Sequence, residues 1–239
     1  MIFSKPTLLL HSCCAPCSSA VLERLANDFD ITIYYYNPNI DTPLEFMRRA
    51  EELSKLDKLG IKYDVIIEDY IPSEYDEAVK GLENLGEGSQ RCYECYKLRL
   101  RKTAEYARNN GFECFTTTLS VSPHKKVEWI HKIGREMEEE FDVRYLDEDF
   151  KKQDGYKRSI ELSKELGLYR QGYCGCAYSK EESIVRRHCE EPKATKQSST
   201  DTNHELRRTN NAIVASESPP PDLVLGFGAR DGTTKERRI

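Results

Sequence analysis

The fold of this chain follows from a stretch near its N-terminus, Thr7-Leu8-Leu9-Leu10-His11-Ser12-Cys13-Cys14-Ala15-Pro16-Cys17. Its first five residues form a short, mostly apolar run, which is typical of a buried β-strand. A helical stretch from Ser18 to Asn27 follows the cysteines directly. A buried strand that passes straight into a helix is the start of a βαβ unit, and such units build parallel sheets.

The chain repeats this alternation of strands and helices. We expect further strands over 31–36, 63–67, 114–118 and 143–145, and helices over 73–85, from the Cys92 region to about Asn110, over 124–141 and over 155–167. A long amphipathic helix is expected from Pro43 to Gly60, with an apolar side that includes Leu44, Met47, Leu53 and Leu56. The pattern predicts an α/β fold, in which a mostly parallel five-stranded sheet carries helices on both faces.

The composition changes after about Ser183. From Ile184 to Ile239 the only aromatic residue is Phe227, and Ser, Thr, Pro, Asn and charged residues dominate. Such a segment buries too little apolar surface to offset the entropy that ordering costs. We therefore predict a single catalytic α/β domain over residues 1–183 and a disordered, dispensable tail over residues 184–239.

The bulk composition is that of a water-soluble protein, with 38% hydrophobic and 32% charged residues. No apolar run approaches the roughly 20 residues that a membrane helix needs. The apolar run after Pro6 is too short for a signal peptide, so we expect a cytoplasmic protein with no membrane partner. The net charge of −5 argues against tight nonspecific binding of nucleic acid, but it leaves room for one local basic face.

Seven of the nine cysteines fall into three groups that lie far apart in the sequence: Cys13, Cys14 and Cys17; Cys92 and Cys95; Cys174 and Cys176. Cytosolic thiols do not persist as structural disulfides, so clustered cysteines indicate metal or redox chemistry. Ligands of parallel sheets bind beyond the carboxyl ends of the strands, and the three groups can meet there. Cys114 fits the core of a strand, and Cys189 belongs to the tail.

The number of clustered cysteines indicates which metal they bind. A structural zinc site uses four ligands, whereas seven thiolates can hold a four-cysteine [4Fe–4S] cluster and leave three for a second metal. Taken alone, the Cys92–Cys95 pair also fits a zinc pair or a redox dithiol, and Cys13 and Cys14 also fit buried core thiols. A zinc-stapled RNA-binding module is therefore an alternative.

A second alternative is a relative of the tRNA sulfurtransferases that works without ATP. The ATP-dependent enzymes of that class have a phosphate-binding Ser-Gly-Gly-x-Asp-Ser loop after the first strand. Here that place holds Ser12-Cys13-Cys14-Ala15-Pro16-Cys17, which contains no glycine and puts thiols where phosphate would bind. The sequence thus argues against the use of ATP.

Several long motifs together resemble the cobalamin-independent epoxyqueuosine reductase family QueH. They are His11-Ser12-Cys13-Cys14-Ala15-Pro16-Cys17, Tyr36-Asn37-Pro38-Asn39-Ile40, Arg91-Cys92-Tyr93-Glu94-Cys95 with Arg99-Leu100, Thr117-Thr118-Leu119-Ser120-Val121-Ser122-Pro123, and Leu166-Gly167-Leu168-Tyr169-Arg170-Gln171 leading to Tyr173-Cys174-Gly175-Cys176. The resemblance covers about Lys5 to Glu182, in order and without large gaps, and leaves the tail without a counterpart.

The resemblance implies a fold, a cofactor and a substrate. The fold would be related to the adenine-nucleotide α-hydrolase (PP-loop, or HUP) sheet, and the seven clustered cysteines would bind a [4Fe–4S] cluster and an adjacent mononuclear iron. The substrate would be tRNA with a GUN anticodon that carries epoxyqueuosine at the wobble position. A flavodoxin or ferredoxin is the expected electron donor, because no nicotinamide or flavin motif such as GxGxxG appears.

The residues around the cysteine motifs supply further candidates. Asp41, His11 and Tyr36 follow predicted strand ends and are candidate proton donors; Asp41 also fits a ligand of the second metal or a turn residue, His11 an orienting group and Tyr36 a pocket wall. Arg91, Arg170 and Tyr169 adjoin cysteine motifs and are candidates for RNA binding. Cations that could form a local basic face gather around the same motifs: Arg48, Arg49, Arg91, Lys97, Arg99, Arg101, Lys102, Lys125, Lys126 and Arg170.

Overall fold

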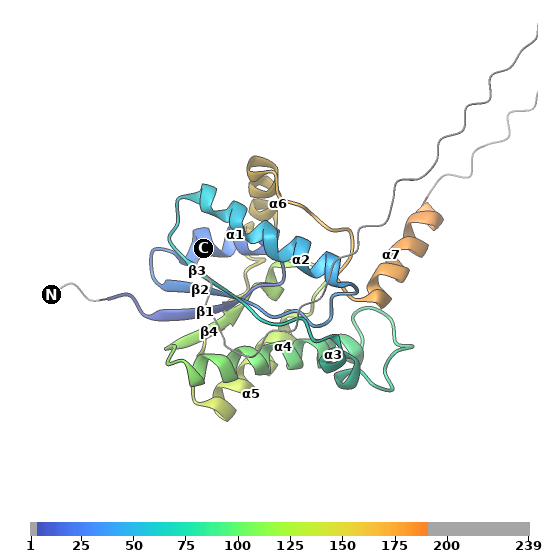
Figure 1. The fold of residues 1–239 in the computed structure, drawn as a ribbon, viewed down its shortest axis with the longest axis horizontal. Coiled ribbons are helices and arrows are strands. Elements are labelled where there is room, and N and C mark those ends of the chain that lie inside the picture. The colour runs from blue at the N-terminus through green and yellow to red at the C-terminus, as the bar shows by residue number, and fades with distance from the viewer. Residues whose placement is uncertain (1–3, 191–239) are drawn as a thin grey trace, which may run out of the picture. The chain divides into compact units, whose positions relative to one another are not determined.

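The computed structural model describes residues 4–190, with side chains described up to residue 186. A five-stranded sheet with the order β3-β2-β1-β4-β5 lies at its centre (Figure 1). All four strand pairs are parallel. The strands are β1 (Thr7–His11), β2 (Asp30–Tyr35), β3 (Asp64–Ile67), β4 (Cys114–Thr117) and β5 (Arg144–Tyr145). The predicted α/β fold with a parallel five-stranded sheet is confirmed.

Strand β1 is the middle strand, and its register places the residues that matter for function. His11, its last residue, pairs with Tyr34 of β2 on one side and with Thr117 of β4 on the other. Leu8, Leu9 and Leu10 are fully buried, since this strand is covered on both faces. The carboxyl ends of the three inner strands therefore lie side by side, next to the loop that carries Cys13.

Helices cover both faces of the sheet. The helices are α1 (Ala15–Leu25), α2 (Pro43–Glu51), the 3-10 helix η1 (Glu52–Leu59), α3 (Pro72–Ala78), α4 (Gln90–Asn109), the 3-10 helix η2 (Thr118–Val121), α5 (Val127–Phe141), α6 (Gly155–Leu166) and α7 (Ala177–Glu190). Helices α1, α2 and α6 lie on one side of the strands, and α4 and α5 lie on the other (Figure 1). None of the described helices is long and apolar enough to cross a membrane.

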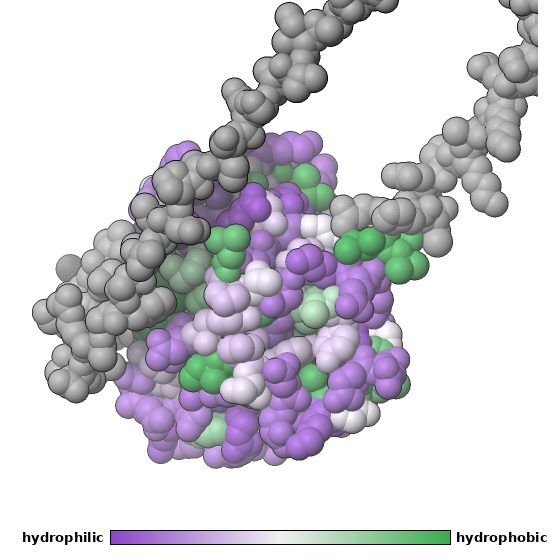
Figure 2. Space-filling view, turned by 45° about the vertical axis from the view of Figure 1, so that its right-hand side comes forward, coloured by the Kyte–Doolittle hydropathy of each residue, from purple (hydrophilic) through white to green (hydrophobic). Residues whose placement is uncertain are grey.

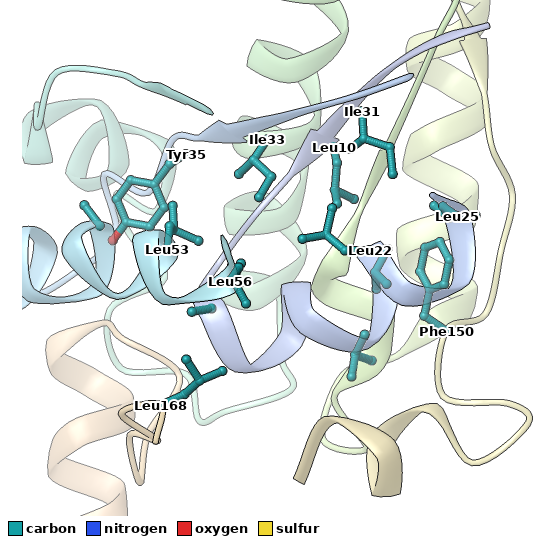
Figure 3. Packing of buried hydrophobic residues seen from close by; sticks show 14 of the residues in the cluster. Leu10, Leu22, Leu25, Ile31, Ile33, Tyr35, Leu53, Leu56, Phe150 and Leu168 are labelled. Carbon is teal, nitrogen blue, oxygen red and sulfur yellow. The ribbon is translucent and has the colours of Figure 1, made fainter. Parts of the chain in front are cut away.

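The two faces of the sheet carry separate apolar cores. One core joins side chains of β1 and β2 to α1, η1 and the segment after α6, as Figure 3 shows for Leu10, Leu22, Ile33 and Leu56. The other core packs Leu9 and Phe115 against α4 and α5. Leu9 and Leu10 point to opposite faces because successive strand residues alternate. The sheet is thus held rigidly from both sides, as a scaffold for residues at its rim must be.

The helix that was expected from Pro43 to Gly60 differs in two ways. It continues as the 3-10 helix η1 after Glu51, and Leu44 and Met47 are exposed rather than buried. The inward side of α2 carries Phe46, Arg49 and Ala50. The prediction of an inward apolar side at Leu44 and Met47 was wrong because a buried arginine takes an inward position that the pattern assigned to apolar residues.

Two further differences concern the ends of helices. The helix that was expected over 73–85 ends at Ala78, and the chain continues in turns. Helix α7 was not predicted; it runs past Ser183, the expected domain boundary, to Glu190. The remainder of the predicted tail lies outside the described residues.

Candidate metal centre at the carboxyl end of the sheet

The first cysteine group occupies the turn between β1 and α1. Cys14 is the N-cap residue of α1 with an extended backbone, and Pro16 stands in the first turn, where its missing N–H costs nothing. This sharp strand-to-helix turn brings the Sγ atoms of Cys13, Cys14 and Cys17 within 4.8 Å of one another. Thr118, the first residue of η2, holds the cysteine loop in place, because its Oγ1 accepts a hydrogen bond from the Cys13 amide at 3.2 Å.

The three thiols influence each other's protonation. Hydrogen bonds from the Cys14 and Cys17 thiols lower the pKa of Cys13 well below its ordinary value. The same contacts with Cys13 raise the pKa of Cys14 to about 11 and also raise the pKa of Cys17. Among the three thiols Cys13 thus gives up its proton most readily, and its neighbours stabilise the thiolate through hydrogen bonds.

The second and third cysteine groups meet where α4 begins. Cys95 and Cys176 are buried in one small apolar core. This core also contains Tyr75 of α3 and Val79, the residue that directly follows α3. Burial raises the pKa of Cys95 to about 12 and also raises that of Cys92. Cys92 and Cys95 therefore hold their protons more tightly than free thiols do, and a metal that binds them has to release those protons.

The loop that carries Cys174 and Cys176 is fastened to the segment after β2. The Arg49 guanidinium donates to the Cys174 carbonyl at 3.1 Å, and the Asp41 amide donates to the Gly175 carbonyl at 2.9 Å. Gly175 has φ +138, and a Cβ there would lie 3.0 Å from Arg49 Nη1. Glycine is required at this position because the loop lies too close to Arg49 for a side chain.

Two cations connect all three cysteine groups electrostatically. Burial alone would lower the pKa of the Arg99 guanidinium, but the nearby thiols of Cys95, Cys174 and Cys13 raise it above its ordinary value. Lys125 behaves in the same way, with Cys174 and Cys13 as the main thiols that raise its pKa. Thiols of all three groups thus act on Arg99, and thiols of the first and third groups act on Lys125.

The residues present fit a thiolate-bound metal group that carries negative charge. Arg49 and Arg99 are 2% and 1% exposed, and each has a buried Nη2 atom without a hydrogen-bond partner. Buried guanidinium nitrogens without acceptors are costly unless an anionic group faces them. Between residues 4 and 186, only Cys13, Cys14 and Cys17 gather three ligand atoms within 4.8 Å, so the four other thiols are grouped less tightly.

His11 is held between the strands on either side of β1. Its Nδ1 lies 2.8 Å from Thr117 Oγ1 and its Nε2 lies 3.2 Å from the Tyr36 carbonyl oxygen. Burial, reinforced by the charge of Arg99, lowers the pKa of His11 to about 3. The imidazole is therefore neutral at physiological pH and acts in the structure as a group that joins the ends of β1, β2 and β4.

Tyr36 and Asp41 lie on the segment after β2, at the same end of the sheet. The Tyr36 hydroxyl donates to Glu74 Oε2 at 2.6 Å, and burial raises the pKa of the phenol, so it keeps its proton. Burial would raise the pKa of Asp41, but hydrogen bonds from Lys180 at 2.5 Å and Tyr173 at 2.9 Å outweigh it and lower the pKa. Asp41 is thus an ionised carboxylate with its partners in place.

The candidates for RNA binding have partners within the chain, although Arg91 is buried and Arg170 is exposed. Arg91 is 2% exposed, donates to the Glu83 carbonyl and to Glu182, and stacks on the Tyr178 ring at 4.3 Å. Arg170 donates to the Ser159 carbonyl and to Ser163 Oγ.

Tyr169 packs in the same way against α2. The Arg48 guanidinium lies 3.4 Å from the centre of its ring, and its hydroxyl donates to Glu45. In this structure Tyr169 and Arg170 hold the loop before Cys174 in place, whereas Arg91 connects α4 to α7.

Sequence reasoning misjudged the arginines that surround the thiols. Arg49, Arg91 and Arg99 were grouped with the cations of an RNA-binding face, yet all three are buried. A signal for Arg99 was present, since it follows Cys95 by four residues and therefore lies on the same side of α4. No comparable signal marks Lys180 or Thr118, whose contacts with Asp41 and Cys13 arise only in the folded chain.

Comparisons with known proteins agree with the motifs. A family model described as "Epoxyqueuosine reductase QueH" matches residues 8–182, which include all seven clustered cysteines. A protein named epoxyqueuosine reductase QueH from Streptococcus pyogenes is 42% identical over 180 residues, with 73% of this chain and 71% of that protein covered. The protein of that name from Thermotoga maritima is 40% identical over 176 residues, with coverages of 72% and 90%. The one from Haemophilus influenzae is 42% identical over 179 residues, with coverages of 74% and 72%.

Proposed function

The chain belongs to the epoxyqueuosine reductase QueH family, and we propose that it reduces the epoxide of epoxyqueuosine at the wobble position of tRNA to give queuosine, in the final step of queuosine biosynthesis. One observation carries the proposal: the family match spans all seven clustered cysteines, and one thiol of each of their three groups acts on the charge of Arg99. An oxidoreductase needs such a site, whereas a structural zinc staple would use four of these thiols and leave three without a purpose.

The cofactor that fits best is a [4Fe–4S] cluster with an adjacent mononuclear iron. Four of the thiolates would hold the cluster, and the remaining three would hold the second iron, with Asp41 as a candidate for a further ligand. Such a site supplies electrons one at a time from the cluster and a Lewis-acidic position for the epoxide oxygen from the iron. The ionised state of Asp41 and its attachment to the Cys174–Cys176 loop support this role.

The buried cations of the chain would balance the charge of this site. Thiolate ligands bring several negative charges into a region of low dielectric constant, where unpaired charge is costly. Arg99 and Lys125 lie among the thiols, and Arg49 holds the Cys174 carbonyl. These three residues let the protein bury thiolates at a place that the epoxide has to reach.

The reaction removes one oxygen atom, so it consumes two electrons and two protons and releases water. Among the three candidate proton donors, we assign Tyr36, because its hydroxyl carries a proton, which it donates to Glu74 Oε2 at 2.6 Å in this structure. A proton from the solvent has to restore the hydroxyl after each turnover. His11 is neutral and committed to Thr117 and Tyr36, so we assign it a positioning role. Asp41 is ionised and serves as a ligand or an acceptor rather than an acid.

The partners follow from this chemistry. The RNA substrate would be a tRNA with a GUN anticodon, whose wobble nucleotide leaves the stack so that its base reaches the thiol-lined rim. The electrons would come from a small one-electron carrier such as a flavodoxin or ferredoxin. The protein would act in the cytoplasm, where tRNA is modified and thiols stay reduced.

Anaerobic purification followed by iron and sulfide analysis, paired with an assay on epoxyqueuosine-containing tRNA, tests the proposal. We expect a brown protein that contains iron and sulfide and converts the epoxide. Replacement of Cys92 or Cys176 by Ala should bleach the protein and abolish the reduction, whereas Cys114→Ala in β4 should leave both intact. Zinc in place of iron, or full activity in both site variants, would refute the assignment.

A further inference from the structure

Two aromatic rings and two lysines form a cluster on the outer side of α4 and α5. The Tyr93 and Trp129 rings meet edge to face, with centroids 5.4 Å apart and an interplanar angle of 83°. The Lys126 ammonium lies 4.0 Å from the centre of the Trp129 ring, and the Lys132 ammonium lies 5.9 Å from the centre of the Tyr93 ring. We call these four residues the aromatic–lysine cluster.

The aromatic–lysine cluster adjoins the thiol site through the chain itself. Tyr93 directly follows Cys92 in the first turn of α4, and Lys126 directly follows Lys125, whose ammonium lies among the thiols. Both rings are partly exposed and both lysines of the cluster are exposed. The cluster is therefore joined directly to the residues of the thiol site along the chain.

Each ring of the cluster packs against the apolar core and also has a lysine ammonium beside it. Partly exposed aromatic side chains next to cations are typical of surfaces that stack nucleic-acid bases and contact phosphates. No carboxylate among residues 4–186 lies within ion-pair distance of Lys126, and Lys132 has only the loose contact with Glu136 at 3.9 Å. Lys97, one turn after Tyr93 on α4, adds a further cation without an ion pair in the described part of the chain.

The composition of the cluster favours RNA over a protein partner. The face that Figure 2 shows is mainly hydrophilic where its residues are described, with separate hydrophobic areas. A docking protein would bury apolar area, whereas an RNA loop needs a few rings and positive charges. Base stacking on an aromatic ring is stronger than an exposed cation–π contact, so a base can displace Lys126 from the Trp129 ring. The displaced ammonium then remains at hand for a phosphate.

We propose that the aromatic–lysine cluster binds an unpaired nucleotide of the anticodon loop next to the nucleotide that is reduced. The base stacks on Trp129 and Tyr93, and Lys126 and Lys132 contact the phosphates on either side of it. The inference rests on the proposed function for the identity of the RNA. It adds a site that positions the loop while the neighbouring base enters the thiol site.

Tryptophan fluorescence of the unaltered holoprotein tests the stacking directly, because Trp129 is the only tryptophan in the chain. Unmodified RNA hairpins with a GUN anticodon loop should quench this fluorescence as they bind. A fully paired RNA duplex of equal length offers no unstacked base and should bind weakly and leave the fluorescence unchanged. Hairpin binding that saturates in an independent assay with labelled RNA and leaves the fluorescence unchanged would overturn the proposal.

Variants of single residues measure how much each residue contributes to the affinity for RNA. Trp129→Leu should weaken hairpin binding by about 5- to 100-fold, whereas Trp129→Phe should keep most of it. Lys126→Gln should lower the slope of log K against log salt by about one, since one phosphate contact is lost. Lys58→Gln, an exposed lysine of η1 on the other face of the sheet, should change neither quantity. Unaltered Tm and iron content would show that the variants fold.

The outcome distinguishes this proposal from the proposed function. Binding of unmodified hairpins involves no reduction, so a protein that binds them through Trp129 and yet leaves epoxyqueuosine unchanged would refute only the reductase. A Trp129→Leu protein that binds hairpins as tightly as the wild type, while both reduce the substrate, would refute only the stacking site. Loss of reduction in Trp129→Leu should be restored by RNA in excess, because the thiol site is untouched.

Discussion

Arg99 is a buried cation whose charge the neighbouring thiols can balance. Its Nε donates to the Cys95 carbonyl at 3.3 Å and its Nη1 donates to Asn37 Oδ1 at 3.3 Å, while its Nη2 has no partner. A buried charge that is only partly paired destabilises a fold. Arg99 is therefore tolerated because the negative charge of metal-bound thiolates would offset its own.

Replacement of Arg99 by Gln should make the metal site harder to reduce. The added electron is less stable once a nearby positive charge is gone, by about 1–2 kcal/mol, which corresponds to roughly 40–90 mV for a one-electron step. Potentiometry of the anaerobic protein measures the shift. Arg101→Gln removes an exposed arginine that pairs with Glu140 and serves as the control. An unchanged potential in Arg99→Gln would contradict the role assigned to this charge.

Replacement of Tyr36 by Phe tests the assigned proton donor. The turnover rate should fall by roughly 10²- to 10⁴-fold, the usual contribution of a positioned acid, while iron content and RNA affinity stay the same. Tyr34 is a matched control, because it is also buried, belongs to the same segment and donates to a glutamate, Glu68, at 3.0 Å. Equal turnover rates in Tyr36→Phe and Tyr34→Phe would show that a residue other than Tyr36 donates the proton.

At the scale of elements, α6 depends on a glycine at its first residue. A Cβ at Gly155 would lie 1.9 Å from the Phe150 carbonyl oxygen, which belongs to the backbone and cannot rotate away. Gly155→Ala should therefore lower the stability by about 1–3 kcal/mol or more, measured by chemical unfolding. Gly172→Ala adds the same methyl group where nothing lies within 4 Å, and it should have little effect. Equal stabilities would mean that α6 can shift to accept the methyl group.

Glu52 of η1 connects this helix to the loop before Cys174. It accepts hydrogen bonds from the Tyr169 amide at 2.8 Å and from Lys55 at 2.6 Å, which outweigh the effect of burial and lower its pKa. A carboxyl with a lowered folded-state pKa stabilises the fold above its unfolded pKa of about 4.3, and this contribution disappears as the pH falls through the folded pKa.

Glu52→Gln should therefore cost about 1 kcal/mol at pH 7, and the difference from the wild type should shrink between about pH 5 and pH 3. Urea unfolding across this range measures it. Glu51→Gln, at an exposed neighbouring position, controls for the loss of a charge. A difference that stays constant with pH would show that Glu52 acts through packing alone.

Local patterns predicted those elements whose burial follows from their own residues. The apolar runs of β1 and β2 marked the centre of the sheet, and cysteine spacing marked the thiol groups, because both are local properties. The inward side of α2 was misjudged because Arg49 is buried through contacts with Glu45 and the Cys174 carbonyl, which lies 125 residues away. Helix α7 escaped prediction because its sequence is highly charged and gives only a weak periodic signal.

At the scale of the whole molecule, the segment after Glu190 should be dispensable. The family match ends at residue 182, before this segment begins. A chain that ends at Glu190 should keep the iron content, the Tm and the rate of epoxyqueuosine reduction of the full chain. Reduced iron content or a lower Tm would show that the segment contributes to the fold, whereas a slower rate alone would assign it to substrate binding.

Metal removal tests whether the three cysteine groups act as one site in the whole molecule. The groups join the loop after β1, the start of α4 and the segment before α7, so a shared metal would link elements on both faces of the sheet. A ligand that binds only the folded state, present at about 100 times its Kd, adds about 2.7 kcal/mol to the free energy of unfolding, or roughly 5–10 °C in Tm for a chain of this size.

Anaerobic chelation should therefore lower the Tm by that amount in the wild type. It should do the same in Cys114→Ser, because the Cys114 thiol contacts the Thr7 carbonyl in the sheet and lies outside the three groups. Cys17→Ser and Cys176→Ser should start near the lower Tm and respond little to chelation, because each lacks one end of the link. If only one of these two variants lost the response, the groups would bind metal separately, and the shared site at the rim of the sheet would be refuted.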